Sequence, residues 1–359
     1  MIIPLALLAV SLAAGQTTPP SEAFAPEPRP EAQNSAPLGG VSVGLLKERF
    51  VEAIDEPTRV KILDQIAITR PVSAQDVSAL FDMFSRYSDP GLRKKVMASL
   101  ALIDPSSPQL EPLFISYLNQ PEPETQLFGI YGAFYVRSRQ GLPLVRKIAE
   151  RKFEATDSSA ISQLSSRNAW WAQFDALSVL AQWEGQKVLP LLRKKADESA
   201  AVGRLLGQFF WRQTFPELKS WSESADANVR EKAVQAAGAQ IEPSEARATR
   251  DGMLDIVRDP KADEEVRHRL ALKVGACSTD AEVEALIAEH DKAKEDKLRL
   301  LLMGAVAYSR SPKAVPLLVR YARDSEDEIM RKGARAQLVD MVGEEQTKSL
   351  IGDKKDVKK

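Results

Sequence analysis

The sequence predicts an all-α fold made of repeated helix pairs. An acidic residue recurs four positions before an arginine, and an apolar residue directly precedes each of these arginines. The pairs are Asp89/Arg93, Asp226/Arg230, Asp263/Arg267, Glu295/Arg299 and Asp327/Arg331. From Arg230 onward, successive arginines of this motif are 37, 32 and 32 residues apart. A fixed period in the thirties is typical of helical repeat proteins, in which each repeat is one small helical unit.

A second motif, a proline followed by two large apolar residues, indicates the first helix of each pair. It occurs at Pro112-Leu113-Phe114, Pro143-Leu144-Val145, Pro190-Leu191-Leu192 and Pro316-Leu317-Leu318. Proline is tolerated in a first helical turn because the N–H groups there have no acceptor within the helix. No stretch alternates between apolar and polar residues at a period of two, so we expect no sheet.

The two motifs together predict about nine helix pairs between residues 43 and 342. In the 263–277 segment, for example, Val266, Leu270, Val274 and Cys277 recur at helical spacing and define one apolar face. The expected pairs are 43–54 with 57–69, 74–87 with 89–103, 108–119 with 122–137, then 141–185, 186–214, 215–223 with 226–240, 244–277, 280–309 and 311–342.

These two motifs resemble those of HEAT repeats, including the divergent form found in bilin lyase-type proteins. The resemblance covers residues 43–342, is clearest from Asp226 onward and is weakest between residues 155 and 214. It implies that antiparallel helix pairs stack into a right-handed α-α superhelix, a solenoid. Most proteins of this kind bind other macromolecules, which the resemblance therefore also implies here.

The N-terminal segment has the features of an export signal. An apolar run from Ile2 to Ala14 is followed by Gly15, and small residues at this point suit a cleavage site, although no Lys or Arg precedes the run. A membrane span needs about 20 apolar residues, so we expect no stable span. Residues 1–15 are therefore interpreted as a signal peptide, and the mature protein as periplasmic or secreted.

Two further segments lie outside the expected repeats. Residues 16–42 are rich in proline and small polar residues, which predicts a disordered linker. Residues 343–359 are interpreted as a charged C-terminal tail, which ends in several lysines.

Composition argues against several classes of function. The chain has 49 Lys and Arg against 50 Asp and Glu, whereas a nucleic-acid-binding protein needs an excess of basic residues. The two histidines, His268 and His290, have no Cys or second His at ligand spacing. The chain also has no phosphate-binding glycine loop and no nucleophile elbow. We therefore predict no catalytic residue, no metal and no cofactor.

The acid–arginine motif allows two interpretations. Its arginines could form a basic stripe that binds an acidic partner, or they could bond to a loop carbonyl or to an acid of the neighbouring repeat. Because an acid accompanies every arginine and the net charge is only −1, we favour the structural interpretation.

The aromatic residues of the middle of the chain are the strongest candidates for a binding site. All five tryptophans lie within 52 residues, at positions 170, 171, 183, 211 and 221. Helical spacing places Trp171 on the same face as Asp175, and Trp211 beside Arg204. Since exposed Trp and Arg are common interface anchors, these four residues are our candidate partner-binding site. For the aromatic cluster as a whole we favour another interpretation, in which these residues fill a junction between two halves of the array, and we reserve the interface role for Trp171 and Trp211 in particular.

The sequence therefore favours an exported, non-enzymatic scaffold that binds another protein, which we expect to be a protein of the cell envelope. The alternative is an enzyme of the HEAT-like lyase or hydroxylase type, with a ligand pocket in the aromatic central repeats.

Overall fold

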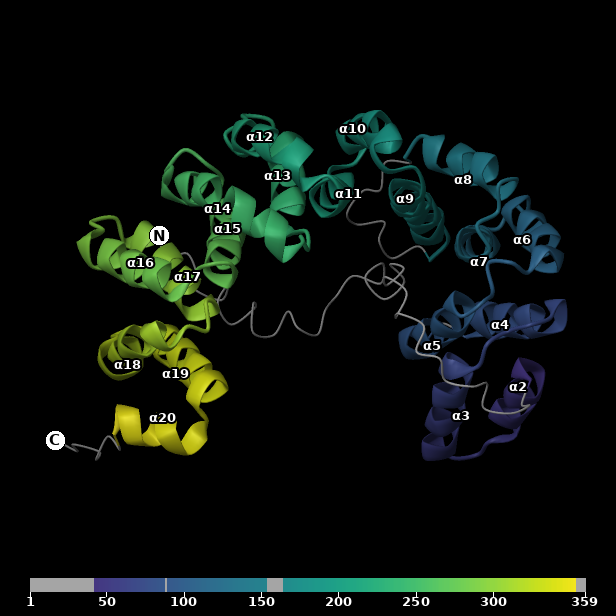
Figure 1. Ribbon diagram of the computed structural model, residues 1–359, viewed down its shortest axis with the longest axis horizontal. Coiled ribbons are helices and arrows are strands. Elements are labelled where there is room, and N and C mark those ends of the chain that lie inside the picture. The colour runs from purple at the N-terminus through teal and green to yellow at the C-terminus, as the bar shows by residue number, and fades with distance from the viewer. Residues whose placement is uncertain (1–41, 88, 154–163, 353–359) are drawn as a thin grey trace. The chain divides into compact units, whose positions relative to one another are not determined.

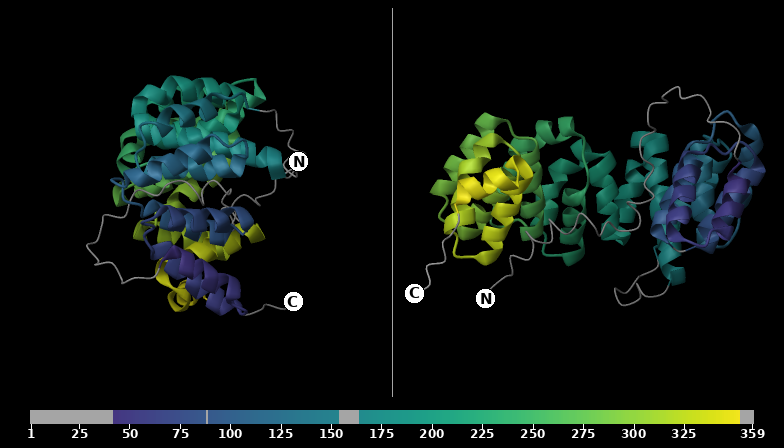
Figure 2. Two further views of the ribbon diagram at one scale, coloured as in Figure 1. Left: turned by 90° about the vertical axis from the view of Figure 1, so that its right-hand side faces the viewer. Right: turned by 90° about the horizontal axis from the view of Figure 1, so that it is seen from below.

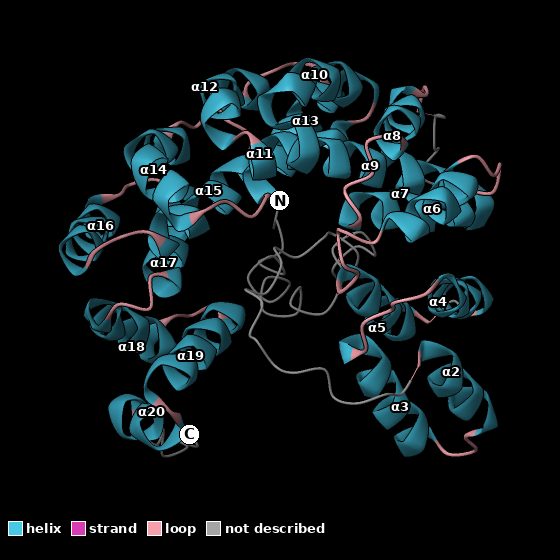
Figure 3. Ribbon diagram, turned by 45° about the vertical axis from the view of Figure 1, so that its right-hand side comes forward, coloured by secondary structure: helices cyan, strands magenta, loops and turns pink. Residues whose placement is uncertain are grey.

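The computed structural model describes residues 42–87, 89–153 and 164–352. Every regular element within these ranges is a helix, and none is a strand, as Figure 3 shows. The chain divides into two compact units, one ending at Glu198 and the other beginning at Ser199. The expected signal peptide and most of the expected linker lie outside the described residues, as do residues 353–359.

The first unit consists of helix pairs whose members pack in two layers (Figure 1). Helices α3, α5, α7 and α9 contact one another in turn, while α2 contacts α4 and α6 contacts α8. The helices are α2 (Val43–Glu52), α3 (Glu56–Ile68), α4 (Ala74–Arg86), α5 (Pro90–Ala101), α6 (Glu111–Leu118), α7 (Pro123–Tyr135), α8 (Gly141–Glu150), α9 (Leu164–Glu184) and α10 (Leu189–Glu198). Short 3-10 turns, η2 (Pro108–Leu110) and η4 (Gly185–Val188), lead into α6 and α10.

The second unit repeats this layering. Helices α11, α13, α15 and α17 contact one another in turn, and Figure 2 shows helices of this unit side by side. The elements are η5 (Ala200–Val202), α11 (Gly203–Phe209), α12 (Trp211–Ser222), α13 (Ala227–Gly238), α14 (Pro243–Arg258), α15 (Glu264–Ala276), α16 (Asp280–Lys292), α17 (Asp296–Tyr308), η6 (Pro312–Ala314), α18 (Val315–Asp324), α19 (Glu328–Val342) and α20 (Glu344–Ile351).

The acid–arginine motif is structural, as the sequence analysis favoured. The aspartate caps the second helix of a pair: Asp55, Asp89, Asp226, Asp263 and Asp327 each accept a hydrogen bond from a first-turn N–H. In five turns the arginine caps the end of the preceding helix by donating to a main-chain oxygen six positions earlier. The donor–acceptor pairs are Arg59–Ala53, Arg93–Tyr87, Arg230–Ser224, Arg299–Ala293 and Arg331–Ser325. The motif therefore fixes both helix ends at one turn.

Arg93 and a further arginine of the motif, Arg267, also reach the next repeat. Arg93 lies 2.7 Å from Glu124, and buried Arg267 lies 3.8 Å from Glu295. The prediction that such arginines contact a loop carbonyl or a neighbouring acid is confirmed at these positions. The motif thus leaves little free positive charge for a binding stripe.

Glycine permits unusually close packing between second helices of neighbouring pairs. A Cβ atom added at Gly203 would lie 2.4 Å from the main-chain oxygen of Lys232, and one at Gly207 would lie 2.4 Å from that of Ala236. At Gly275 the corresponding distance, to Ala305, is 2.1 Å. Because real Cβ atoms do not approach oxygen so closely, a side chain at these positions would force the helices apart.

Three expected boundaries differ from the structure. Helix α12 begins at Trp211 instead of residue 215, because the helical backbone is interrupted at Phe210 (φ −138°, ψ 39°). Pro216 consequently lies inside the helix and not at its start. Helix α20 occupies residues 344–351, which the sequence analysis assigned to the charged tail; Thr347 is buried there and donates to Gly343 at 2.8 Å. The single expected array of residues 43–342 divides at the short elements around residue 199.

Candidate functional site

The four residues chosen from the sequence do not form one site in a single unit. Trp171 and Asp175 lie on α9 in the first unit, whereas Arg204 and Trp211 lie on α11 and α12 in the second. Each pair is therefore described within its own unit.

The aromatic residues of α9 pack mainly on one another. Trp171 is half-buried, and its ring meets that of Trp170 edge to face with centroids 4.6 Å apart. Trp170 stacks on Phe174 at 5.1 Å, and Phe153 lies 6.0 Å from Trp170. Trp171 is thus the accessible edge of an aromatic cluster whose inner ring, Phe174, is buried.

Asp175 is not a surface residue. Its exposed fraction is 2%, because α9 packs against both α7 and α8 and its polar face is covered as well as its apolar face. Burial raises the pKa of Asp175 to about 7, and the hydroxyl of buried Tyr131 on α7 partly offsets this increase. Asp175 therefore does not share an exposed face with Trp171.

Trp211 is also buried, with an exposed fraction of 3%. Its indole N–H donates to the Thr249 hydroxyl of α14 at 2.8 Å, and its ring lies 5.4 Å from that of Phe215. The sequence analysis treated Trp211 as a continuation of the preceding helix. Because the chain breaks at Phe210, Trp211 instead starts α12 and packs onto α14.

Trp211 nevertheless lines a small cleft, which we call the Trp211 cleft. It has a volume of about 200 Å³ and includes Gln208, Phe209, Trp211, Ile241, Glu242 and Glu245 among its lining residues. Phe209 and Ile241 are half-exposed, so the cleft has apolar walls, while Glu242 is exposed.

Glu245 supplies the hydrogen-bonding chemistry of the Trp211 cleft. Its Oε1 atom pairs with Arg212 Nε at 2.8 Å. Its Oε2 atom is buried and accepts no hydrogen bond from any residue that the structure describes. A buried carboxylate oxygen without a donor is costly, so Glu245 keeps unsatisfied acceptor capacity at the wall of the cleft.

Arg204 belongs to a basic cluster with Arg269 and Lys273 of α15. Burial lowers the pKa of Arg204, and the charge of Arg269 lowers it further. Burial, with smaller contributions from Arg269 and Arg204, lowers the pKa of Lys273 to about 8. Arg269 pairs with Glu265 at 2.8 Å, and Lys273 donates to the main-chain oxygen of Ala239. The half-buried Arg204 thus lies in a positive environment.

His290 makes a polar network that the sequence did not indicate. Its Nδ1 lies 2.9 Å from Asp291 Oδ1, and its Nε2 lies 2.7 Å from the hydroxyl of Tyr321 on α18. Arg320 donates to the same Asp291 carboxylate at 2.5 Å. His290 itself is buried, so the network joins α16 to α18.

Within residues 42–87, 89–153 and 164–352, no group of three or more His, Cys, Asp or Glu side chains is placed to hold a metal ion. None of the helices in these ranges is both long and apolar enough to cross a membrane.

No protein-family model matches the chain, and no curated protein matches it at a significant level. The sequence analysis found Trp211 by its aromatic character, but it missed Glu245 and a larger cavity in the first unit, because both depend on residues from separate loops and helices.

Proposed function

We propose that this protein is an exported, HEAT-like helical repeat scaffold that docks another protein of the cell envelope. In this proposal about nine helix pairs stack into a right-handed solenoid, and the apolar N-terminal segment directs export to the periplasm or outside the cell. The layered helix pairs within each unit and the acid–arginine turns support the repeat architecture. No role in binding nucleic acid is proposed, because acidic and basic residues balance.

The Trp211 cleft is the observation that carries the docking function. Its half-exposed apolar walls, Phe209 and Ile241, lie beside two carboxylates, Glu242 and Glu245. The bond from Trp211 to Thr249 holds the indole in place. A preformed cleft loses little side-chain entropy on binding, so its contacts contribute efficiently to affinity.

The chemistry of the cleft suits a lysine or arginine side chain from the partner. The aliphatic stem of such a residue would contact Phe209 and Ile241. Its charged head would pair with the exposed carboxylate of Glu242, beside that of Glu245. The alternative lyase or hydroxylase function has no comparable support, since the described aromatic rings of α9 pack on one another.

Co-purification from the envelope fraction tests this proposal. The parent chain is compared with a Phe209→Ala/Ile241→Ala variant and with Tyr308→Ala, which removes an exposed aromatic residue elsewhere in the unit. A partner retained by the parent and by Tyr308→Ala, but reduced at least about tenfold by the cleft variant, supports the proposal. Equal recovery with a thermally stable cleft variant would contradict it.

A further inference from the structure

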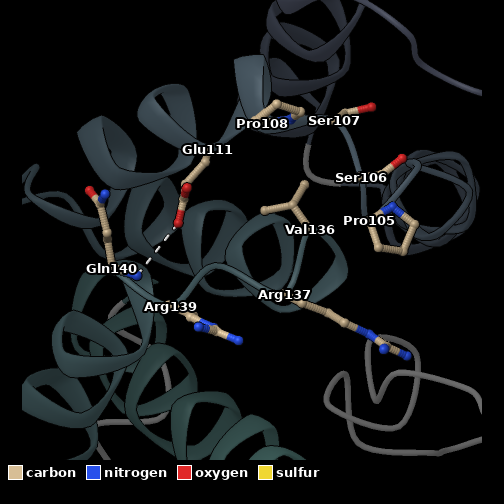
Figure 4. Close-up of a pocket in the computed structure, with 9 residues that line it drawn as sticks. All are labelled: Pro105, Ser106, Ser107, Pro108, Glu111, Val136, Arg137, Arg139 and Gln140. Carbon is tan, nitrogen blue, oxygen red and sulfur yellow. Dashed lines mark hydrogen bonds between the residues drawn. The ribbon is translucent and has the colours of Figure 1, made fainter.

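We propose that a cavity in the first unit binds the carboxylate of an acidic peptide. The cavity lies between the loop that follows α5 and the loop that joins α7 to α8, with Glu111 of α6 at one side (Figure 4). Its volume is about 430 Å³, which is room for a short peptide segment. This site is separate from the Trp211 cleft, and it would take a ligand group of the opposite charge.

Two arginines of the α7–α8 loop give the cavity its charge. Arg137 and Arg139 are exposed, and Figure 4 shows both along the same edge of the cavity. Neither side chain makes a hydrogen bond or ion pair with any residue that the structure describes. The arginines of the acid–arginine motif, in contrast, are bonded to helix ends. Within the part of the chain that the structure describes, Arg137 and Arg139 therefore remain available for a ligand.

Glu111 holds the arginine loop in place. Its Oε1 atom accepts a hydrogen bond from the Ser138 hydroxyl at 2.6 Å, and the N–H of Gln140 points to the same atom at 3.5 Å. The Ser138 hydroxyl in turn accepts from the N–H of Gly141 at 2.7 Å. The segment between the two arginines is thus fixed to α6, which limits the loop motion that binding would have to restrict.

The charges around the cavity favour an anionic group such as a carboxylate. Two arginines and one glutamate leave a net charge of +1, which attracts an anion. The planar fork of a guanidinium also fits a carboxylate through two parallel hydrogen bonds. Pro105, Pro108 and Val136 provide apolar walls for the aliphatic part of the ligand.

The backbone at Arg137 indicates that arginine is not present for helix stability. Arg137 follows the end of α7 with φ 52°, the left-handed conformation that glycine adopts most easily. Its N–H bonds to Phe134 and that of Ser138 bonds to Ala133, the pattern of a Schellman helix end. Glycine would satisfy this geometry with less strain, so arginine at this position suits a role of its side chain.

This geometry allows a test in which stability and binding change in opposite directions. The full chain is titrated with a fluorescent tetraglutamate peptide whose N-terminus is acetylated and whose C-terminus is amidated. We expect Arg137→Gly to weaken binding about tenfold or more while leaving the melting temperature unchanged or higher. Arg139→Gln should weaken binding similarly. Arg310→Gly is the matched control: Arg310 also has positive φ (55°) but lies in the second unit, so peptide binding should be unchanged.

Two further peptides identify the ligand chemistry. An acetylated tetraglutamine peptide with a free C-terminus contains a single carboxylate; if it binds as well as the glutamate peptide, the site takes chain termini, and if it does not, the site takes acidic side chains. Either result supports a carboxylate site. Three results would overturn the proposal: an amidated tetraglutamine peptide that binds as tightly, a phosphoserine peptide that binds more tightly than both carboxylate peptides, or an Arg137→Gly variant that keeps full affinity.

Discussion

The buried guanidinium of Arg267 donates a hydrogen bond from Nε to the main-chain oxygen of Val257 at 2.9 Å. Val257 lies in the last turn of α14, where main-chain oxygens lack partners within the helix. The arginine therefore joins the end of one helix to the start of the next. The same kind of bond recurs at Arg93 and Arg331, which makes it a repeated structural device.

Replacing Arg267 should destabilise the protein. Arg267→Met removes the hydrogen bond to Val257 and leaves a buried oxygen without a donor, so we expect a loss of about 2 kcal/mol in the free energy of unfolding. Urea denaturation measures this loss. Arg335→Met on α19 is the control, because Arg335 is exposed and its replacement should change stability by less than about 0.5 kcal/mol. Similar losses in both variants would contradict the assignment.

Two glycines of neighbouring helices should respond to alanine with opposite signs. Gly275→Ala places a Cβ atom 2.1 Å from the oxygen of Ala305 and should destabilise the protein by about 2 kcal/mol. At Gly304 the nearest atom would be 3.9 Å away, so Gly304→Ala should stabilise α17 by up to about 1 kcal/mol through helix propensity. Melting temperatures of the two variants would move in opposite directions. A melting temperature of Gly275→Ala equal to or above that of the parent would refute the close packing of α15 on α17.

Asp175 should make stability depend on pH. Burial raises its pKa to about 7, whereas the pKa of an aspartate in the unfolded chain is about 3.9. Between these values the folded protein binds more protons than the unfolded chain, so the free energy of unfolding falls as pH rises. In the Asp175→Asn variant, the decrease in the free energy of unfolding with rising pH should be smaller by roughly 2–4 kcal/mol. Urea unfolding at about pH 4.5 and about pH 7.5 measures the difference, and an unchanged pH dependence in the variant would count against a buried Asp175.

The basic cluster of the second unit should behave as a coupled set of charges. Arg204→Gln removes a positive charge that lowers the pKa of Lys273, so this pKa should rise from about 8 toward its ordinary value. NMR of methylated lysines follows the titration directly. Arg247→Gln on α14 serves as the control, since Lys273 is affected by Arg269 and Arg204. A pKa of Lys273 that responds equally to both changes would show that Arg204 is not its neighbour.

The helices could be predicted from the sequence because their ends carry local signals. Asp89 and Asp263 cap helices that begin where the sequence analysis placed them. Trp211 could not be placed, since the backbone break at Phe210 has neither glycine nor proline to indicate it. The burial of Asp175 was missed for another reason: helical spacing assigns a residue to a face, but it does not show how many neighbours cover that helix. The sequence did not indicate Arg137 and Arg139 as site residues, because the cavity that they line is formed together with a loop about 30 residues earlier in the chain.

Photo-crosslinking at the Trp211 cleft tests the docking function most directly. A photoreactive residue replaces Gln208 at the cleft in one chain and exposed Ala336 on α19 in another, and both chains are irradiated in intact cells. We predict one protein crosslinked through position 208, absent at position 336 and lost when Glu242→Lys/Glu245→Lys is added to a chain that remains folded. The same crosslinks at both positions, or a crosslink at 208 that survives the charge reversal, would contradict the proposal that this cleft docks a basic side chain of a partner.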